Sequence, residues 1–162
     1  MPNGYSKTQI RLHWVIFILI VFQFALHEPI AEGWDIMMQG DMPEPNILVL
    51  QHVIGGLVIL ALVLWRLRIR AARGAPALPA EEPMFLKGIA HLTHFVLYAL
   101  MVLMPVSGAI AFFGQVEAAG NAHEFMRILL LLFALLHILG ALYQQSVLKT
   151  NILDRMRTAD PN

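Results

Sequence analysis

The chain has 162 residues, which suits one domain, and 58% of them are hydrophobic while only 14% are charged. This composition, with a mean hydropathy of +0.65, excludes an ordinary soluble globular protein and indicates an integral membrane protein. The chain contains no cysteine, which excludes disulfides, iron–sulfur clusters and the covalent attachment of c-type haem. We expect a lipid bilayer as its main partner and no nucleic acid.

Four apolar segments are long enough to cross a hydrocarbon core of about 30 Å, which takes roughly 20 residues of helix. They lie near residues 10–30, 47–67, 89–113 and 125–148. The first segment has the basic start and apolar run of a signal peptide, but its length, its histidine and the lack of a cleavage site favour a retained helix. We therefore predict an all-α fold, an integral membrane four-helix bundle formed by a single domain over residues 1–162.

Local signals mark the ends of these helices. Ser6 and Gln9 are compatible with a capping box ahead of the first segment, and Pro29 is predicted to end that helix. For the acidic connection that follows, we expect either a short helix at the membrane interface or a disordered loop. Pro79 belongs to a turn-rich loop between the second and third segments, and Pro105 is predicted to kink the third helix.

The charged residues are strongly segregated, although the net charge is zero. The connections over residues 27–46 and 114–124 contain no Lys or Arg. By the positive-inside rule, both termini and the middle loop are cytoplasmic, and the two acidic connections face outward. The basic residues other than Arg127 lie at the N-terminus, in the middle loop or at the C-terminus, namely Lys7, Arg11, Arg66, Arg68, Arg70, Arg73, Lys87, Lys149, Arg155 and Arg157.

Four histidines in these apolar segments form the candidate site. His123 and His137 are fourteen residues apart, so about 21 Å of helix rise separates them and both return to nearly the same face. Helix direction pairs His13 with His137 at an inner level and His52 with His123 at an outer level. Two axial imidazoles fill both open positions of a haem iron, which favours electron transfer. We therefore predict two haem b groups, each held through its iron by one pair.

Three further side chains are secondary candidates for binding. Arg66, His94 and Arg127 are candidate contacts of a haem propionate or of a quinone head group. The alternative for each is ordinary placement at the membrane interface, with the two arginines snorkelling toward it. His27 is predicted to be a plain boundary residue.

Glycines accompany the predicted ligands. Gly55 and Gly56 follow His52, and Gly140 lies one turn beyond His137. Small residues at these points would give a flat macrocycle room between helices. Helix packing is the alternative explanation for all three.

These residues resemble the bacterial cytochrome b561 family, which are four-helix membrane proteins carrying two b-type haems. The resemblance implies the same four axial ligands, electron exchange between the haems and membrane quinone such as ubiquinone, and a place in the respiratory chain of the bacterial cytoplasmic (inner) membrane. It is carried by Tyr5-Ser6, Gln9-Ile10, His13-Trp14, Gln51-His52, Gly55, Arg66, Gly88, Ala90-His91-Leu92, His94, His123-Glu124 and His137.

The leading hypothesis is a dihaem b-type cytochrome that transfers electrons across the membrane to or from the quinone pool. A periplasmic protein would be its electron donor or acceptor. The alternatives are a haem-bearing membrane anchor subunit of a dehydrogenase or hydrogenase complex, a superoxide oxidase that reduces ubiquinone, and a scaffold without cofactor.

Two features separate this chain from relatives with those activities. Its connection between the third and fourth segments is short, whereas the superoxide-oxidising type has a much longer one. Gln144 and Gln145 stand where many relatives carry paired histidines. An amide can hydrogen-bond a quinone but does not titrate near neutral pH, so Gln144 is a candidate quinone contact rather than a proton carrier.

The acidic outer connections bear on the choice of electron donor. Superoxide is an anion, and a negatively charged entrance slows its approach. We therefore expect a cationic donor, such as a basic soluble cytochrome. The outer connections are made acidic by Glu28, Glu32, Asp35, Asp41, Glu44 and Glu117.

Overall fold

The computed structural model describes residues 4–77 and 83–160, so Pro79 of the predicted turn-rich loop lies outside the described residues. Within these ranges the regular structure is helical. Four of the helices, α1, α3, α4 and α5, are long and apolar enough to cross a membrane, which confirms the predicted all-α membrane bundle. The elements are α1 (Lys7–Ala25), α2 (Glu28–Met38), α3 (Ile47–Arg73), α4 (Met84–Gly114), α5 (Glu117–Ser146) and the short 3₁₀ helix η1 (Asp154–Met156).

Helix α1 begins at Lys7 because Ser6 caps it. The Ser6 hydroxyl accepts a hydrogen bond from the Gln9 backbone N–H at 3.2 Å, and the Gln9 side chain accepts one from the Ser6 N–H at 3.0 Å. This confirms the predicted capping box. The helix already ends at Ala25, so the prediction that Pro29 ends it was wrong. Pro29 instead lies in the first turn of α2, where its missing N–H leaves no helical hydrogen bond unmade.

The acidic outer connection forms the helix α2, which decides between the two structures expected there. This helix packs on α3, and its only buried residue is Gly33. Its Trp34 ring lies against Gly120 of α5, where an added Cβ would come within 2.6 Å of the indole. The glycine therefore lets α2 lie across the outer ends of α3 and α5.

Three of the helices extend at one end well beyond the apolar segments that predicted them. Helix α3 continues to Arg73, α4 begins at Met84 and α5 begins at Glu117. The predicted limits at residues 67, 89 and 125 follow the hydrophobic runs, whereas helical hydrogen bonding continues into polar residues outside the hydrocarbon. Only Gln115 and Val116 therefore connect α4 to α5.

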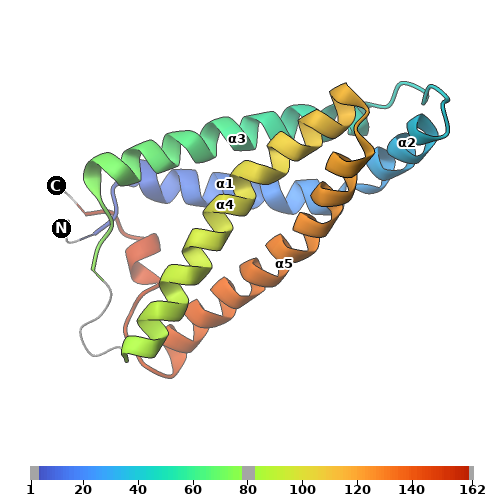
Figure 1. Cartoon of the computed structure of the whole chain (residues 1–162). Helices are drawn as coiled ribbons and strands as arrows, with labels where there is room; N and C mark the ends of the chain where they lie inside the picture. Colours follow the sequence, from blue (N-terminus) through green and yellow to red (C-terminus); the bar gives the residue numbers. More distant parts are fainter. Residues whose placement is uncertain (1–3, 78–82, 161–162) are drawn as a thin grey trace.

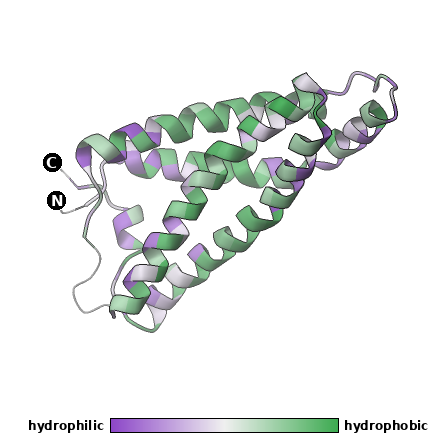
Figure 2. Ribbon diagram, in the orientation of Figure 1, coloured by the Kyte–Doolittle hydropathy of each residue, from purple (hydrophilic) through white to green (hydrophobic). Residues whose placement is uncertain are grey.

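The four long helices form two antiparallel pairs, α1 with α3 and α4 with α5, which diverge toward the end that holds both termini (Figure 1). Helix α4 also packs on α3, whereas α1 and α5 are not among the closely packed pairs of the described chain. A core between α1 and α3 contains Leu12, Ile16, Ile59 and Val63. Many other large apolar side chains are exposed along the middle of the helices, where the hydrocarbon would cover them (Figure 2).

The C-terminal segment returns to the N-terminus and fastens it. The Asp160 carboxylate accepts a hydrogen bond from the Gly4 N–H at 3.0 Å and lies 3.9 Å from the Arg73 guanidinium. The Trp14 indole donates to the Met156 carbonyl at 3.0 Å. Both termini therefore lie at the end rich in basic residues, as the predicted topology requires.

Candidate functional site

The four histidines of the predicted site lie in two pairs. The ring centres of His13 on α1 and His137 on α5 are 6.1 Å apart, and those of His52 on α3 and His123 on α5 are 6.3 Å apart. A metal ion bonded to one nitrogen of each ring at about 2 Å would put the two ring centres about 6 Å apart. Each pair therefore has the spacing of two ligands on opposite sides of one metal ion.

The two pairs lie at different depths along α5. His123 and His137 belong to one unbroken helix, so about 21 Å of helix rise separates the two levels. The His123 level lies toward α2 and the acidic connection, and the His137 level toward the basic end. The structure thus brings together the partners that helix direction predicts, His13 with His137 and His52 with His123.

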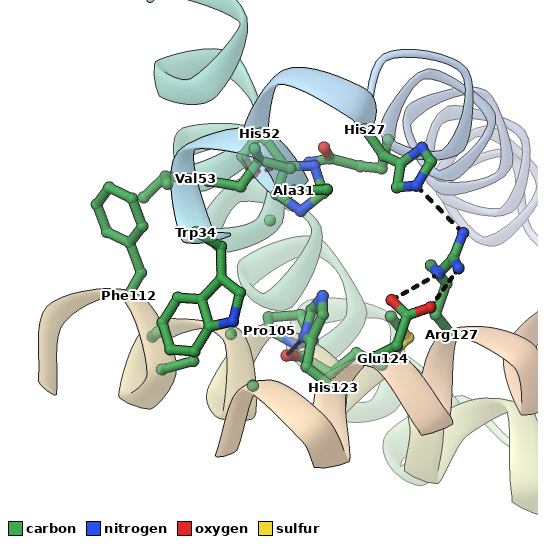
Figure 3. Close-up of a pocket in the computed structure, with 18 of the residues that line it drawn as sticks. His27, Ala31, Trp34, His52, Val53, Pro105, Phe112, His123, Glu124 and Arg127 are labelled. Atoms are coloured by element: carbon green, nitrogen blue, oxygen red, sulfur yellow. Dashed lines mark hydrogen bonds and ion pairs between the residues drawn. The ribbon is translucent and has the colours of Figure 1, made fainter. Parts of the chain in front are cut away.

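The outer pair lines a cavity of about 440 Å³. This volume is within the range of small-molecule and cofactor sites. His52 and His123 lie on opposite sides of it, and Ala31 and Trp34 of α2 contribute to its wall (Figure 3). Most of its other lining is apolar, including Phe112. The cavity combines an apolar body with two facing imidazoles.

Helix α4 fixes the orientation of His123. Its Nδ1 lies 2.9 Å from the Met104 carbonyl oxygen and 3.3 Å from the Ser107 hydroxyl. An added Cβ at Gly108 would lie 3.0 Å from the His123 ring. Because Nδ1 is engaged with the backbone carbonyl, Nε2 is the ring nitrogen left for a metal. The sequence alone gave no sign of these contacts.

Charged and polar residues gather at the rim of the outer cavity. The Arg127 guanidinium makes two contacts with the Glu124 carboxylate, one of them at 3.1 Å, and its Nη1 lies 3.3 Å from Nε2 of His27 (Figure 3). All three residues line the cavity. His27, predicted to be a plain boundary residue, directly precedes α2 and also contributes to this rim.

The inner pair has a third imidazole beside it. The His94 ring centre lies 5.0 Å from that of His137, edge to face, and its Nδ1 lies 2.7 Å from the Ala90 carbonyl oxygen. This spacing is shorter than the 6.1 Å between His13 and His137, and too short to hold a metal between the rings. His94 therefore lies beside the inner pair but is not spaced to share a metal ion with His137.

Arg66 supplies a cation at the inner level. Its Nε donates to the Tyr98 hydroxyl at 3.0 Å, and its Nη1 donates to the Gln9 carbonyl. The contact with Gln9 holds the guanidinium against α1 one helical turn before His13. The structure thus places two of the predicted secondary candidates, Arg66 and His94, beside one histidine pair.

Comparison with known proteins identifies the family. The chain matches the prokaryotic cytochrome b561 family over residues 4–159. It belongs to this family. It is 32% identical over 156 residues to cytochrome b562 of Cereibacter sphaeroides, which covers 94% of each chain. It is 29% identical over 181 residues to the probable superoxide oxidase CybB of Yersinia pestis, covering 96% of this chain and 97% of that one. It is also 27% identical over 110 residues to cytochrome b561 homolog 1 of Escherichia coli, covering 65% and 57%.

As a member of the cytochrome b561 family, this chain is a multi-pass cytochrome of the bacterial inner membrane that binds haem b and transfers electrons. The residues present fit such a group. The two imidazole spacings, the apolar cavity and the glycine beside the His123 ring are features that a planar cofactor with two axial ligands requires.

The glycines predicted to make room for the macrocycle have different surroundings in this cytochrome b561. Gly56 lines the outer cavity, and no atom lies within 4 Å of the Cβ that would be added there or at Gly140. Gly55 instead faces the side-chain amide of Gln23. Of these three predicted glycines, only Gly56 lines the outer cavity.

Gln144, the candidate quinone contact, lies near the inner end of α5. It is 7% exposed, and its side-chain oxygen accepts a hydrogen bond from the Thr150 hydroxyl at 2.9 Å. The Thr150 hydroxyl also lies 3.2 Å from the Gln144 backbone carbonyl. Gln144 therefore helps to fasten the start of the C-terminal segment to α5.

Proposed function

We propose that this cytochrome holds two haem b groups, one between His13 and His137 and one between His52 and His123, and transfers electrons across the membrane to or from the quinone pool. The observation that supports this most directly is the repeated ring spacing, 6.1 and 6.3 Å, at two depths. Haem iron with two axial imidazoles supplies reversible one-electron transfer without an open position for oxygen.

The protein's own residues orient and neutralise the bound groups. The Met104 carbonyl holds the His123 ring so that its Nε2 is available as ligand. Arg127 at the outer rim and Arg66 at the inner level would each pair with a carboxylate of the porphyrin edge. Their present partners, Glu124 and Tyr98, keep both guanidinium groups in place.

A quinone head group would be recognised at the inner level. Arg66 can donate an N–H group to a quinone carbonyl oxygen there. His94, whose Nδ1–H faces the Ala90 carbonyl, presents its Nε2 as an acceptor for a hydroxyl of the quinol. His94 lies against His137, so a quinone bound to it would lie close to the inner haem. Reduction of this quinone to the quinol requires two electrons and two protons.

Quinol-driven reduction of the isolated chain tests this function against the anchor-subunit alternative. In liposomes that contain only this chain, ubiquinol should produce the reduced b-type spectrum. His94→Ala should slow that reduction by about tenfold or more. The matched control His91→Ala removes an exposed histidine that makes the same type of contact, Nδ1 to the Lys87 carbonyl oxygen, and should have little effect. An anchor subunit would show no reduction by quinol and would purify with stoichiometric dehydrogenase or hydrogenase subunits.

A superoxide oxidase is the second candidate, because the relative in Yersinia pestis bears that name. The outer side of this chain argues for a cationic donor instead. Its α2 exposes Glu28, Glu32 and Asp35, and the charge of Arg127 is compensated by Glu124. An anion would therefore be repelled on approach.

Stopped-flow reduction distinguishes these donors. Superoxide should reduce the haem slowly, and the rate should rise with ionic strength because salt screens like charges. A basic soluble cytochrome should react faster, and salt should slow its reaction. Rapid reduction by superoxide with little dependence on salt would contradict a cationic donor.

A further inference from the structure

One ligand of the outer pair lacks the contact that orients the other. The Nδ1 of His52 is buried and has no hydrogen-bond partner. The Nδ1 atoms of His123 and His94 each lie within 2.9 Å of a backbone carbonyl oxygen. A buried polar atom is normally hydrogen-bonded, and a histidine that binds a metal normally donates its other N–H to an acceptor.

Two acceptors without partners lie next to His52. The side-chain oxygens of Gln23 on α1 and Gln51 on α3 are both buried and make no hydrogen bond. The amide nitrogen of Gln23 donates to the backbone carbonyl of His52 at 3.0 Å. Gln23 also lines the same cavity as the His52 ring. Its amide group is therefore fixed at residue 52, with its oxygen available to accept.

Gly55 gives these amides their space. A Cβ added at Gly55 would overlap the amide nitrogen of Gln23 and lie 3.3 Å from that of Gln51. Any larger residue at 55 would push the Gln23 side chain away from His52. The close contact with the Gln23 amide, rather than a need for room for a macrocycle, explains why residue 55 is a glycine.

We propose that Gln23 is a positioning residue for the outer haem, whose side-chain oxygen accepts a hydrogen bond from the Nδ1–H of His52 when Nε2 binds the iron. The inference rests on the proposed function. The bond would fix the tautomer and plane of His52 and raise its basicity as a ligand. Gln51 is the weaker candidate because adjacent residues leave a helix about 100° apart, which directs its side chain to a different face.

The reduction potential of the outer haem tests this role, measured in a His137→Ala background that lacks the inner haem. Gln23→Leu removes the acceptor and should raise the potential and weaken haem retention by about 10- to 100-fold. Gln23→Glu supplies a stronger acceptor and should lower the potential. Gln51→Leu, the matched control, should change neither. A purely structural role of Gln23 would not shift the potential in opposite directions in the Leu and Glu variants. When the same substitutions are made in the parent chain, the spectrum of the inner haem reports on folding.

The outcomes separate this inference from the function on which it rests. If neither the parent chain nor the His137→Ala chain binds haem, the outer site and the proposed function fail together. If only the His137→Ala chain fails to bind haem, the potential of the outer haem is measured in the parent chain. If the outer haem is bound but neither Gln23 variant moves its potential, only the role of Gln23 is overturned. The same holds if Gln51→Leu produces the shift instead.

Discussion

His52→Ala should remove the outer haem and leave the inner one, and His137→Ala should do the reverse. Each histidine belongs to only one pair, and the two pairs lie about 21 Å apart along α5. Loss of one axial imidazole leaves an iron with an open position and a cavity without its second anchor. In each variant, the haem content of the purified chain should fall by half, with the loss of a different component of the reduced spectrum.

His91→Ala is the control for these two variants, because its exposed imidazole belongs to neither pair. It should keep the full haem content. Loss of both haems in either ligand variant would show that the bundle forms only around both cofactors, against two separable sites. An unchanged haem content would exclude the altered histidine as a ligand.

Gly108→Val should damage the outer site selectively. The first added carbon would already lie 3.0 Å from the His123 ring, and the branched side chain adds two methyl groups beyond it. Overpacking of this kind costs about 1–3 kcal/mol when the neighbours must move. The ring is held by its contact with the Met104 carbonyl, so relief would require the ligand to leave its place. We expect the outer haem to be lost or high-spin while the inner spectrum is retained.

Gly88→Val on the same helix separates this effect from a general loss of helix stability. No atom lies within 4 Å of a Cβ added at Gly88, and the residue is exposed. Both variants replace a helical glycine by the same β-branched residue. Equal haem loss in the two would show that helix α4, rather than the position of His123, is responsible.

The features that the sequence predicts well are those governed by periodicity and apolar length. The four spans follow from apolar length and the capping box from Ser6 and Gln9. The cytoplasmic side of both termini, inferred from the basic residues, stays a prediction. The depths of the histidines follow from helix rise, so the partners His13 with His137 and His52 with His123 were predictable. Their role as haem ligands stays a proposal.

The features that sequence reasoning missed depend on contacts between segments far apart in the chain. The position of Trp34 against Gly120 requires α2 to fold back over α5. The contact of Gln23 with residue 52 depends on the register between α1 and α3, which neither helix specifies alone. Pro29 was misassigned because a proline is compatible with a first helical turn as well as with a stop.

The haem content and spin state of the purified full chain test the central claim most directly. If each imidazole pair binds one haem iron, the chain should contain two b-type haems. Both should be low-spin in the oxidised state because both axial positions of each iron carry nitrogen. One haem per chain, or a high-spin signal from either, would contradict the account that the two pairs form two equivalent sites.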